Sequence, residues 1–385
     1  MYNFVTLKNF GGPLTDLTLI LLSAGTSSRF GENVKKHWLR INHKPLWQFV
    51  AHKLEMTQKF SKIIVVSSSN EIAFMKNYAE YTFVEGGTTR QQSLKNALEL
   101  VESEFVLVSD IARACINDDF LERIITKAGS SDAIVPYLNV TDTIVYNGNT
   151  IDRDKVMRIQ TPQLSRTQVL KSALVTKEEF TDESSAIVAN AGTREFILGD
   201  EDAHKITYIS DLNKISCLQA PSTDTLSGNG YDVHAFDTQG TMWLGGVKIE
   251  SDFGFLAHSD GDVALHSLID ALLGAAGMGD IGMLFPDNDD KYKGIDSKEL
   301  LSIVVERLTQ FGFLIVNVDI TIAAEKPRVG KYKLVMRKVI AEILNIDMSR
   351  VNVKATTTEK LGFIGREEGV AVTSNANLKY FNWKE

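Results

Sequence analysis

The first half of the chain alternates apolar runs with amphipathic segments, and this alternation constrains the fold more than any other feature. Apolar runs that predict buried strands lie at 17–22, 62–66, 105–108 and 133–136. Segments with helical periodicity lie between them, at 46–56, 91–101 and 120–128. This rhythm predicts an α/β domain with a Rossmann-like, mostly parallel sheet and helices on both faces. Ligands of such sheets gather at the carboxyl ends of the strands.

Residues 140–160 interrupt the rhythm. Two strand-like segments flank Asn147-Gly148, a dipeptide typical of a tight hairpin turn. A protruding hairpin with little core of its own fits a dimerisation arm, and an ordinary surface hairpin explains the pattern equally well.

The second half of the chain has a different organisation. Residues 212–224 lack clear periodicity, which predicts a linker between domains at 1–211 and 225–385. Beyond the linker we expect strands near 230–236, 316–324, 351–357 and 368–379, and helices near 262–276, 298–311 and 331–344. This order is typical of an α+β domain in which a sheet packs with helices, and a length of 385 residues suits two domains.

The composition excludes several classes of protein. A hydrophobic content of 44% and a charged content of 23% are those of a globular protein, and the net charge of −8 argues against nucleic-acid binding. No apolar stretch reaches the ~18 residues of a membrane span. The two cysteines, Cys115 and Cys217, provide neither a disulfide framework nor a zinc motif. We therefore expect a cytoplasmic protein that holds anionic substrates through local cations.

A candidate phosphate site follows the first strand. Gly25, Ser27, Ser28 and Arg29 offer backbone N–H groups, hydroxyls and a cation, although the Gly-Lys-Ser/Thr of a Walker A loop is missing. Residues after later strands extend the set with cations, small residues and a carboxylate suited to Mg²⁺, namely Lys36, Gly86, Arg90, Ser93, Asp110 and Lys205. Arg90 or Lys205 alone would be an ordinary surface charge, but cations after several strands of one sheet predict a site for a triphosphate.

This set of motifs resembles 2-C-methyl-D-erythritol 4-phosphate cytidylyltransferase over residues 18–211. The motifs are Ala24-Gly25…Arg29…Lys36, Gly86-Gly87-x-x-Arg90-x-x-Ser93, Asp110-x-Ala112-Arg113, Asp142-Thr143, Thr161-Pro162-Gln163, Thr181-Asp182-Glu183-x-Ser185-Ala186 and Lys205-Ile206-Thr207. The resemblance implies that the phosphate of methylerythritol phosphate attacks the α-phosphorus of CTP and releases pyrophosphate.

The resemblance also implies roles for single residues. Arg29 and Lys36 would stabilise the pentavalent phosphorus, and Gly25 would belong to the phosphate loop. The cytidine would face Gly86, Arg90 and Ser93, and Asp110 would meet Mg²⁺. The methylerythritol phosphate would be held by Arg113, Thr143, Arg153, Thr181 and Lys205, with Arg153 supplied by the hairpin arm of a partner subunit. Because the usual Pro-Lys-Gln is here Lys35-Lys36-His37, either lysine could be the catalytic one.

A second candidate site lies between Asp232 and His266. Asp232 and His234 are two positions apart and point to one face of a strand, whereas His266 falls on a predicted helix. Two imidazoles and a carboxylate fill three positions of a catalytic zinc site and leave the fourth open. The alternative is two ordinary histidines and a turn aspartate. Ser259 or Asp260 is the expected N-cap of the helix.

The chain from Thr225 onward resembles 2-C-methyl-D-erythritol 2,4-cyclodiphosphate synthase. The motifs that carry the resemblance are Asp232-x-His234, His258-Ser259-Asp260-Gly-Asp262, His266, Gly279-Asp280 to Asp287 and Thr356-Thr357-Thr358-Glu359 to Arg366. It implies zinc on Asp232, His234 and His266, and Mg²⁺ or Mn²⁺ on Glu359. The 2-phosphate of the substrate would attack the β-phosphorus of its own cytidine diphosphate, release CMP and form a cyclic diphosphate.

The remaining roles follow from the same resemblance. The diphosphate would contact Thr356, Thr357 and Arg366, and Thr357 is the expected catalytic hydroxyl. The methylerythritol part would be oriented by His258, Ser259, Asp280, Gly282 and Asp287, and the cytosine would lie against Ala324 and Arg328. The family is trimeric, so that a dimeric first half and a trimeric second half predict a homo-oligomer compatible with a hexamer.

These resemblances predict a bifunctional enzyme of non-mevalonate isoprenoid synthesis. The alternative is a nucleotidyltransferase for another polyol phosphate fused to a metal-dependent phosphohydrolase or a structural metal domain.

Overall fold

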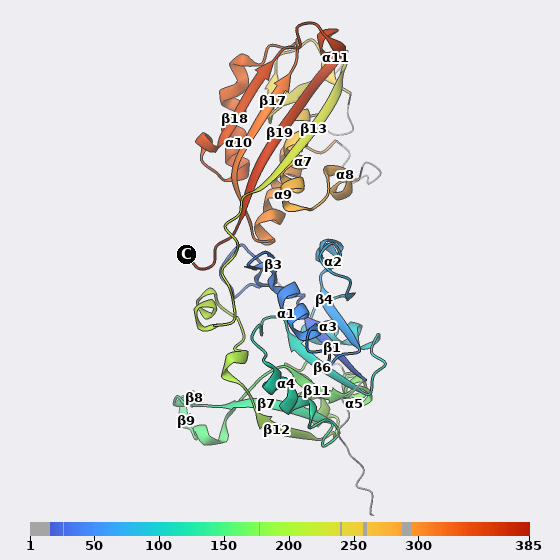
Figure 1. Ribbon diagram of the computed structural model, residues 1–385, viewed down its shortest axis with the longest axis vertical. Coiled ribbons are helices and arrows are strands. Elements are labelled where there is room, and N and C mark those ends of the chain that lie inside the picture. The colour runs from blue at the N-terminus through green and yellow to red at the C-terminus, as the bar shows by residue number, and fades with distance from the viewer. Residues whose placement is uncertain (1–15, 26, 177, 239–240, 257–259, 287–293) are drawn as a thin grey trace, which may run out of the picture. The chain divides into compact units, whose positions relative to one another are not determined.

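The computed structural model describes residues 16–385 except 26, 177, 239–240, 257–259 and 287–293. The chain divides into two compact units, and Figure 1 shows the elements of each. The first unit is Met1–Ala220 together with Trp383–Glu385, and the second is Pro221–Asn382.

The first unit is built around one mixed sheet. Its strands are β1 (Leu17–Leu22), β4 (Lys62–Ser67), β5 (Thr82–Glu85), β6 (Phe105–Asp110), β7 (Ala133–Asn139), β10 (Met157–Ile159), β11 (Gln163–Arg166) and β12 (Arg194–Leu198). The sheet order is β10-β7-β11-β6-β1-β4-β5, and β12 pairs with β7. The helices are α1 (Leu46–Glu55), α2 (Ser69–Met75), α3 (Arg90–Leu98), α4 (Asp118–Ile125), α5 (Thr167–Ala173) and α6 (Glu183–Ala189). Short elements complete the unit: β2 (Arg40–Ile41), β3 (Lys44–Pro45) and the 3₁₀ helices η1 (Lys36–Trp38), η2 (Arg153–Lys155), η3 (Glu201–Ala203) and η4 (Ile209–Lys214).

The predicted strands and the α/β class are confirmed, with one refinement of strand direction. The first apolar run forms β1, and it is buried along its whole length because it pairs in parallel with β4 on one side and β6 on the other. Two strands run the other way: β11 pairs antiparallel with β6 and β7, and β10 pairs antiparallel with β7. The sheet is therefore parallel at its centre and mixed towards one edge.

Alternate side chains of the central strands form a core beneath the helices. Ile20 of β1 and Ile64 of β4 pack with Leu94 of α3, Leu170 of α5 and Ile187 of α6 in one buried cluster. This packing fixes the ends of β1, β5 and β6, from which the loops of the first site emerge.

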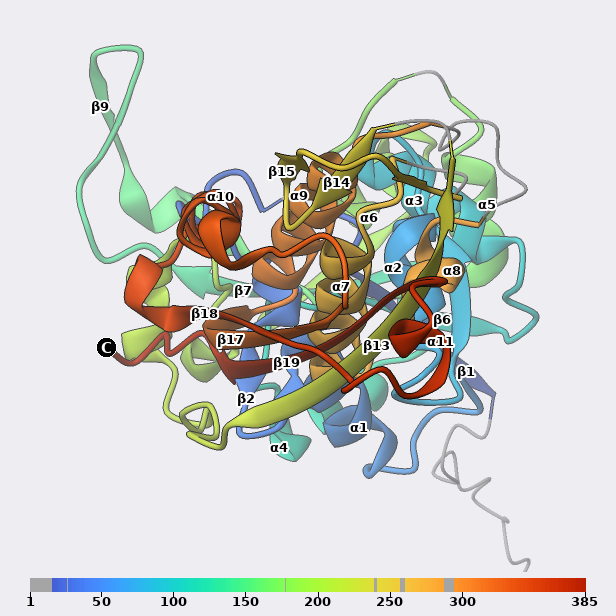
Figure 2. The same cartoon turned by 90° about the horizontal axis from the view of Figure 1, so that it is seen from above.

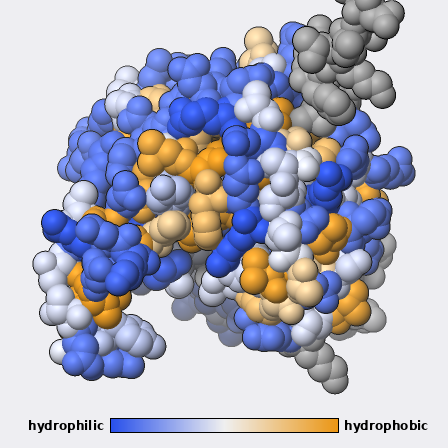
Figure 3. Space-filling view, turned by 90° about the horizontal axis from the view of Figure 1, so that it is seen from below, coloured by the Kyte–Doolittle hydropathy of each residue, from blue (hydrophilic) through white to orange (hydrophobic). Residues whose placement is uncertain are grey.

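The hairpin is present as predicted, with strands β8 (Ile144–Tyr146) and β9 (Asn149–Ile151). It stands away from the body of the first unit in Figure 2. Figure 3 shows hydrophobic and hydrophilic side chains together on a projection at the lower left, and Val145 and Tyr146 at the turn are 61% and 66% exposed.

The cysteine prediction was wrong, because Cys115 and Cys217 are joined in a disulfide with Cα atoms 5.9 Å apart. A separation of 102 residues gave no hint of this pairing. The bond connects the segment after β6 to the segment after η4, both within the first unit.

The second unit contains a sheet with the order β16-β13-β19-β17-β18. Its strands are β13 (Leu226–Asp237), β16 (Gly254–Phe255), β17 (Phe313–Ala323), β18 (Val351–Thr356) and β19 (Gly369–Tyr380), and β14 (Met242–Leu244) pairs with β15 (Val247–Ile249). The helices are α7 (Val263–Ala276), α8 (Ile281–Leu284), α9 (Ser297–Gln310), α10 (Lys333–Leu344) and α11 (Gly362–Gly365), with the 3₁₀ helices η6 (Gly330–Tyr332) and η7 (Met348–Arg350). Long antiparallel ladders join β13 to β19 and β19 to β17, and this sheet-plus-helix architecture confirms the predicted class.

Helix α7 lies unusually close to β13, and this contact positions the second site (Figure 1). A Cβ atom on Gly230 would lie 1.9 Å from the Ser267 carbonyl oxygen, and one on Gly228 would lie 2.1 Å from the Ala271 carbonyl oxygen. Only glycine permits this approach. The N-cap of α7 is Asp262, whose carboxylate accepts from Leu265 N–H at 3.1 Å, so the prediction of Asp260 as the cap was wrong; Ser259 lies outside the described residues.

The last residues of the chain return to the first unit. The indole N–H of Trp383 donates to the Arg40 carbonyl at 2.7 Å, and Trp383 is buried. Among the residues that the structure describes, no helix is long and apolar enough to cross a membrane.

Candidate active sites

A cavity of about 400 Å³ opens at the carboxyl end of β1. It is lined by the loop after β1, the start of α3, the end of β6 and a segment near residue 206. Nine residues predicted for the first site line this cavity: Gly25, Ser27, Ser28, Arg29, Lys36, Arg90, Ser93, Asp110 and Lys205. The cavity therefore combines four cations, one carboxylate and small residues.

Other predicted residues lie outside the cavity lining. Gly86 precedes the lining loop, and its missing Cβ permits close contact with Ala24, since that atom would lie 2.5 Å from the Ala24 Cβ. Arg113 is buried and donates to Thr161 Oγ1 at 2.8 Å and to the Ala203 carbonyl at 2.6 Å. Thr181 is exposed just before α6. Thr143 and Arg153 are exposed on the hairpin region, where Arg153 donates to the Thr141 carbonyl at 2.7 Å.

The two neighbouring lysines occupy different environments. Lys35 Nζ donates to Glu71 at 2.8 Å, whereas Lys36 Nζ lines the cavity and donates to the Ile206 carbonyl at 2.8 Å. Burial, followed by the nearby positive charge of Lys205, lowers the pKa of Lys36 from 10.5 to about 8. The geometry favours Lys36 as the lysine that would meet a phosphate in the cavity.

Asp110 is the centre of a charge cluster on the cavity wall. Burial would raise its pKa, but the charges of Arg90 and Lys205 outweigh that effect and lower the pKa to about 2. Asp110 accepts from Lys205 Nζ at 2.6 Å and from Arg90 Nε at 3.5 Å, and Arg90 also donates to Glu183 at 2.6 Å. The carboxylate is therefore ionised at neutral pH and fits a Mg²⁺ ion held together with substrate phosphates.

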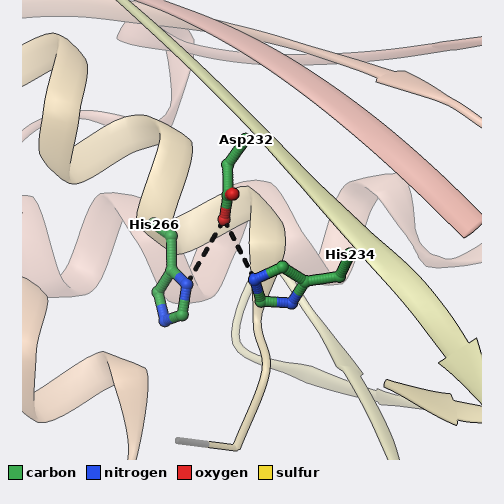
Figure 4. Close-up of side chains that lie close together, drawn as sticks. All are labelled: Asp232, His234 and His266. Atoms are coloured by element: carbon green, nitrogen blue, oxygen red, sulfur yellow. Dashed lines mark ion pairs between the residues drawn. The ribbon is translucent and has the colours of Figure 1, made fainter. Parts of the chain in front are cut away.

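The second site brings Asp232, His234 and His266 together, as Figure 4 shows. The Oδ2 atom of Asp232 lies 3.2 Å from His234 Nε2 and 3.4 Å from His266 Nδ1. One ligand atom from each residue lies within 4.8 Å of the others, a spacing that fits a single metal ion. Burial would raise the pKa of Asp232, but hydrogen bonds from the two histidines hold it well below its usual value.

The outer nitrogen of each imidazole has a fixed partner. His234 Nδ1 lies 2.9 Å from the Gly261 carbonyl, which can only accept, so Nδ1 donates its proton there and Nε2 is the atom that would face a metal. His266 Nε2 lies 2.9 Å from Ser297 Oγ, and that hydroxyl donates its own proton to Asp260. Ser297 therefore accepts from His266 Nε2, and His266 Nδ1 is the atom that would face a metal. These outer hydrogen bonds orient both rings so that Nε2 of His234 and Nδ1 of His266 point toward Asp232.

The other predicted residues of the second site that the structure describes lie in loops or at β18, α8 and α11, and most of them are exposed. Thr356 ends β18 and its carbonyl accepts from Ala324 N–H at 3.0 Å, and Thr357 Oγ1 donates to Glu359 at 3.0 Å. Arg366 is exposed and pairs with Glu368 at 2.8 Å. Asp280 caps α8, while Gly282 and Arg328 are exposed. Three predicted residues, His258, Ser259 and Asp287, lie outside the described residues.

Several residues beside the sites were missed by the sequence analysis. Glu71 lies beneath Lys35, Glu183 holds Arg90, Ser297 holds His266, and Glu325 accepts from Thr358 N–H at 3.1 Å. Glu183 belongs to a quoted motif and could have been chosen as a partner for Arg90. The other three have no motif or spacing that points to them, because only the fold brings them to their partners.

Comparisons with known proteins agree with this geometry. The model of the 2-C-methyl-D-erythritol 4-phosphate cytidylyltransferase family, IspD, matches residues 17–218, and the YgbB family model matches residues 226–379. A relative from Sulfurimonas denitrificans, "Bifunctional enzyme IspD/IspF", is 70% identical over 383 residues, which cover 100% of this chain and 99% of that protein. The protein of the same description from Aliarcobacter butzleri is 52% identical over 97% of this chain and 100% of its own.

A solved structure extends the similarity to three dimensions. "Structure of the Bifunctional IspDF from Campylobacter jejuni" matches with a TM-score of 0.87 at 47% identity, and the match covers 96% of this chain and 100% of that one. Similarity of this extent includes both domains and the connection between them. The chain therefore belongs to the family of bifunctional IspD/IspF enzymes of isoprenoid biosynthesis.

Proposed function

We propose that the chain performs two separate phosphoryl reactions in two functional domains, 1–211 and 225–385, joined by a linker at 212–224. The first transfers CMP from CTP to 2-C-methyl-D-erythritol 4-phosphate. The second cyclises 4-diphosphocytidyl-2-C-methyl-D-erythritol 2-phosphate to the 2,4-cyclodiphosphate. The observation that supports this best is the pair of phosphate-suited sites, a cation-lined cavity and a metal-suited triad, on separate units.

In the first reaction, a phosphate oxygen of methylerythritol phosphate attacks the α-phosphorus of CTP, the new P–O bond forms and pyrophosphate leaves with the electron pair of the broken bond. Lys36 and Arg29, which both line the cavity, would stabilise negative charge on the phosphorus in the transition state. Gly86, Arg90 and Ser93 would face the cytidine. Gly25 would leave space for phosphate, since a Cβ there would meet nothing within 4 Å. A Mg²⁺ ion, when bound with Asp110, would supply further charge neutralisation.

We assign the binding of methylerythritol phosphate to Lys205, Arg113, Thr143 and Thr181, with Arg153 reaching a partner subunit's site from the hairpin. The exposed Val145 and Tyr146 at the hairpin turn support its use as a dimerisation arm. Together with trimeric contacts of the second unit, this arrangement is compatible with a hexamer.

In the second reaction, the 2-phosphate oxygen attacks the β-phosphorus of the cytidine diphosphate, the ring closes and CMP leaves. Asp232, His234 and His266 would hold a zinc or similar ion, which supplies Lewis-acid polarisation of phosphate oxygen when bound. Thr356, Thr357 and Arg366 would orient the diphosphate, and Glu359 would hold Mg²⁺ or Mn²⁺. Asp280, Gly282 and Asp287 with His258 and Ser259 would hold the methylerythritol part, and Ala324 and Arg328 the cytosine.

The test uses the full-length chain and two assays. Pyrophosphate release from CTP and methylerythritol phosphate should be lost in Lys36→Met, which should retain CMP release from the cyclisation substrate. His234→Ala should do the reverse and should bind less zinc. Equal loss of both activities in either variant, or CMP release that survives without bound metal, would overturn the assignment.

A further inference from the structure

A buried carboxylate lies directly beneath the lysine segment of the first site. Glu71 belongs to α2 and is 3% exposed. Its Oε1 accepts from Lys35 Nζ at 2.8 Å, His37 Nε2 at 3.0 Å and Trp38 Nε1 at 3.3 Å. Its Oε2 accepts from Ser67 Oγ at 2.7 Å and Ser68 Oγ at 2.9 Å. One side chain thus organises five donors.

The charge of Glu71 is fixed by these partners. Burial would raise its pKa, but hydrogen bonds and charges from His37 and Lys35 outweigh burial and hold the pKa well below its usual value. An ionised carboxylate can only accept, so His37 must present an N–H at Nε2. Glu71 therefore stays ionised at neutral pH and accepts hydrogen bonds from the residues around it.

The residues that Glu71 anchors lie on both sides of Lys36. Lys35 precedes Lys36, and His37 and Trp38 follow it within the short helix η1. Lys36 itself is directed elsewhere: its backbone N–H donates to Ser27 Oγ at 3.1 Å and its Nζ donates to the Ile206 carbonyl at 2.8 Å. Glu71 holds the residues before and after Lys36, and the Lys36 side chain lines the cavity.

We propose that Glu71 is a positioning residue for cytidylyl transfer, which holds Lys35, His37 and Trp38 so that the Lys36 ammonium faces the α-phosphorus of CTP. This inference rests on the proposed role of Lys36. It assigns a function to a carboxylate that is 34 positions from His37 in the sequence and does not line the cavity.

A purely structural role would predict a different result. If Glu71 only stabilised the packing of α2, its loss would lower the folded fraction and leave the properties of the folded enzyme unchanged. If it positions Lys36, the folded variant should have a lower kcat, because misplacement by about 1 Å costs on the order of 10²-fold in rate. The KM for CTP should change less, since the groups around the cytidine are not held by Glu71.

The pH dependence separates positioning from a direct charge effect. The pKa of Lys36 is set mainly by burial, and then by the charges of Lys205, Asp110 and Arg29. Removing the negative charge of Glu71 would by itself lower the pKa of Lys36 further. Release of Lys36 from its buried position would raise that pKa from about 8 towards 10.5. The alkaline limb of the kcat/KM profile therefore moves to higher pH only if Lys36 has been released.

The experiment compares Glu71→Gln with the matched control Glu55→Gln in the full-length chain. Glu55 also pairs with a histidine, His52, at 3.4 Å, but it is exposed and outside the cavity. Pyrophosphate release is measured as a function of pH, CMP release by the second unit normalises the amount of intact chain, and thermal unfolding reports the fold of the first unit. Glu71→Gln should lose about 10- to 100-fold in kcat and shift the alkaline limb upward, while Glu55→Gln should match the wild type.

A second variant keeps the inference testable if Glu71→Gln does not fold. Lys35→Met removes one of the donors that Glu71 holds, and because the Lys35 side chain is 26% exposed, the substitution disturbs the core less. It should give a smaller loss in kcat and the same upward shift of the alkaline limb. Wild-type kcat and an unshifted profile in the folded Glu71→Gln or, failing that, in Lys35→Met would overturn the positioning role. Absence of pyrophosphate release by the wild-type chain would instead overturn the proposed function itself.

Discussion

The hydroxyl of Ser297 should control how tightly the second unit binds zinc. Ser297 is fully buried at the start of α9, and its Oγ lies 2.9 Å from His266 Nε2 while it donates to Asp260. In Ser297→Ala, the Nε2–H group of His266 loses its acceptor. In the metal-free variant the ring is free to change tautomer, whereas in the metal-bound variant the Nε2–H group is fixed without the Ser297 acceptor. The cost therefore falls on the bound state.

The magnitude follows from the burial of this group. A buried N–H without a partner costs about 1–3 kcal/mol, and about 1.4 kcal/mol corresponds to a factor of ten in affinity. Changes to the outer hydrogen-bond partners of metal ligands typically cost about 10- to 100-fold in metal affinity. We expect Ser297→Ala to bind Zn²⁺ about 10- to 100-fold more weakly than the wild type, with little change in the first activity.

The assay is a competition for Zn²⁺ between the metal-free full-length chain and a chromogenic chelator. Ser302→Ala is the matched control, because Ser302 is an exposed serine of the same helix that donates only to the Lys298 carbonyl at 2.8 Å. Ser297→Thr should restore most of the affinity, since it keeps the hydroxyl. Wild-type affinity in a folded Ser297→Ala chain would refute the argument that Ser297 orders His266.

Four further predictions concern Lys36 and the contact between β13 and α7. Lys36→Met should reduce pyrophosphate release by on the order of 10²- to 10³-fold, as for loss of one group that stabilises transition-state charge, whereas Lys35→Met should lose less; equal losses would contradict the assignment of Lys36. The wild-type kcat/KM for the first reaction should fall as the pH rises through about 8, where Lys36 loses its proton. Because its folded-state pKa is lowered, the contribution of Lys36 to stability should rise over the same window, from about pH 8 to 10.5, and a pH series of unfolding midpoints measures it. Gly230→Ala should destabilise the second unit by about 1–3 kcal/mol and weaken zinc binding, because its Cβ would lie 1.9 Å from the Ser267 carbonyl, while Gly274→Ala, 3.9 Å from its nearest neighbour, should be tolerated; unchanged thermal stability in Gly230→Ala would show that α7 can shift without cost.

The most buried strands could be predicted because a buried strand has a recognisable pattern of apolar residues. The run 17–22 was predicted with its observed bounds, since a strand buried on both faces is apolar at every position. Elements such as α2, with seven residues, and β11, with four, were missed because short segments contain too little periodicity. The antiparallel direction of β11 depends on how its ends connect, which no local pattern encodes.

The site residues also differ in how far a local sequence pattern could predict them. Asp232 and His234 were grouped because a spacing of two places both on one face of a strand, and His266 was added from its position at a predicted helix start; the structure brings the three together. Lys35 and Lys36 could not be separated by their neighbours in sequence, because the difference arises from Glu71, which reaches Lys35 only through the packing of α2. Residues that orient the reacting groups are therefore harder to predict than the groups themselves.

The return of Trp383 to the first unit has a consequence for anyone who wishes to study one half of this enzyme in isolation. The polypeptide leaves the first unit after Ala220 and comes back at Trp383, so that the second unit is an insertion in topology rather than an appended module. A stop codon after residue 220 would strip a buried indole from the Arg40 carbonyl that it contacts. To obtain the first unit alone, residues 221–382 should be replaced with a short flexible loop. This design keeps residues 383–385, and therefore the contact of Trp383 with the Arg40 carbonyl.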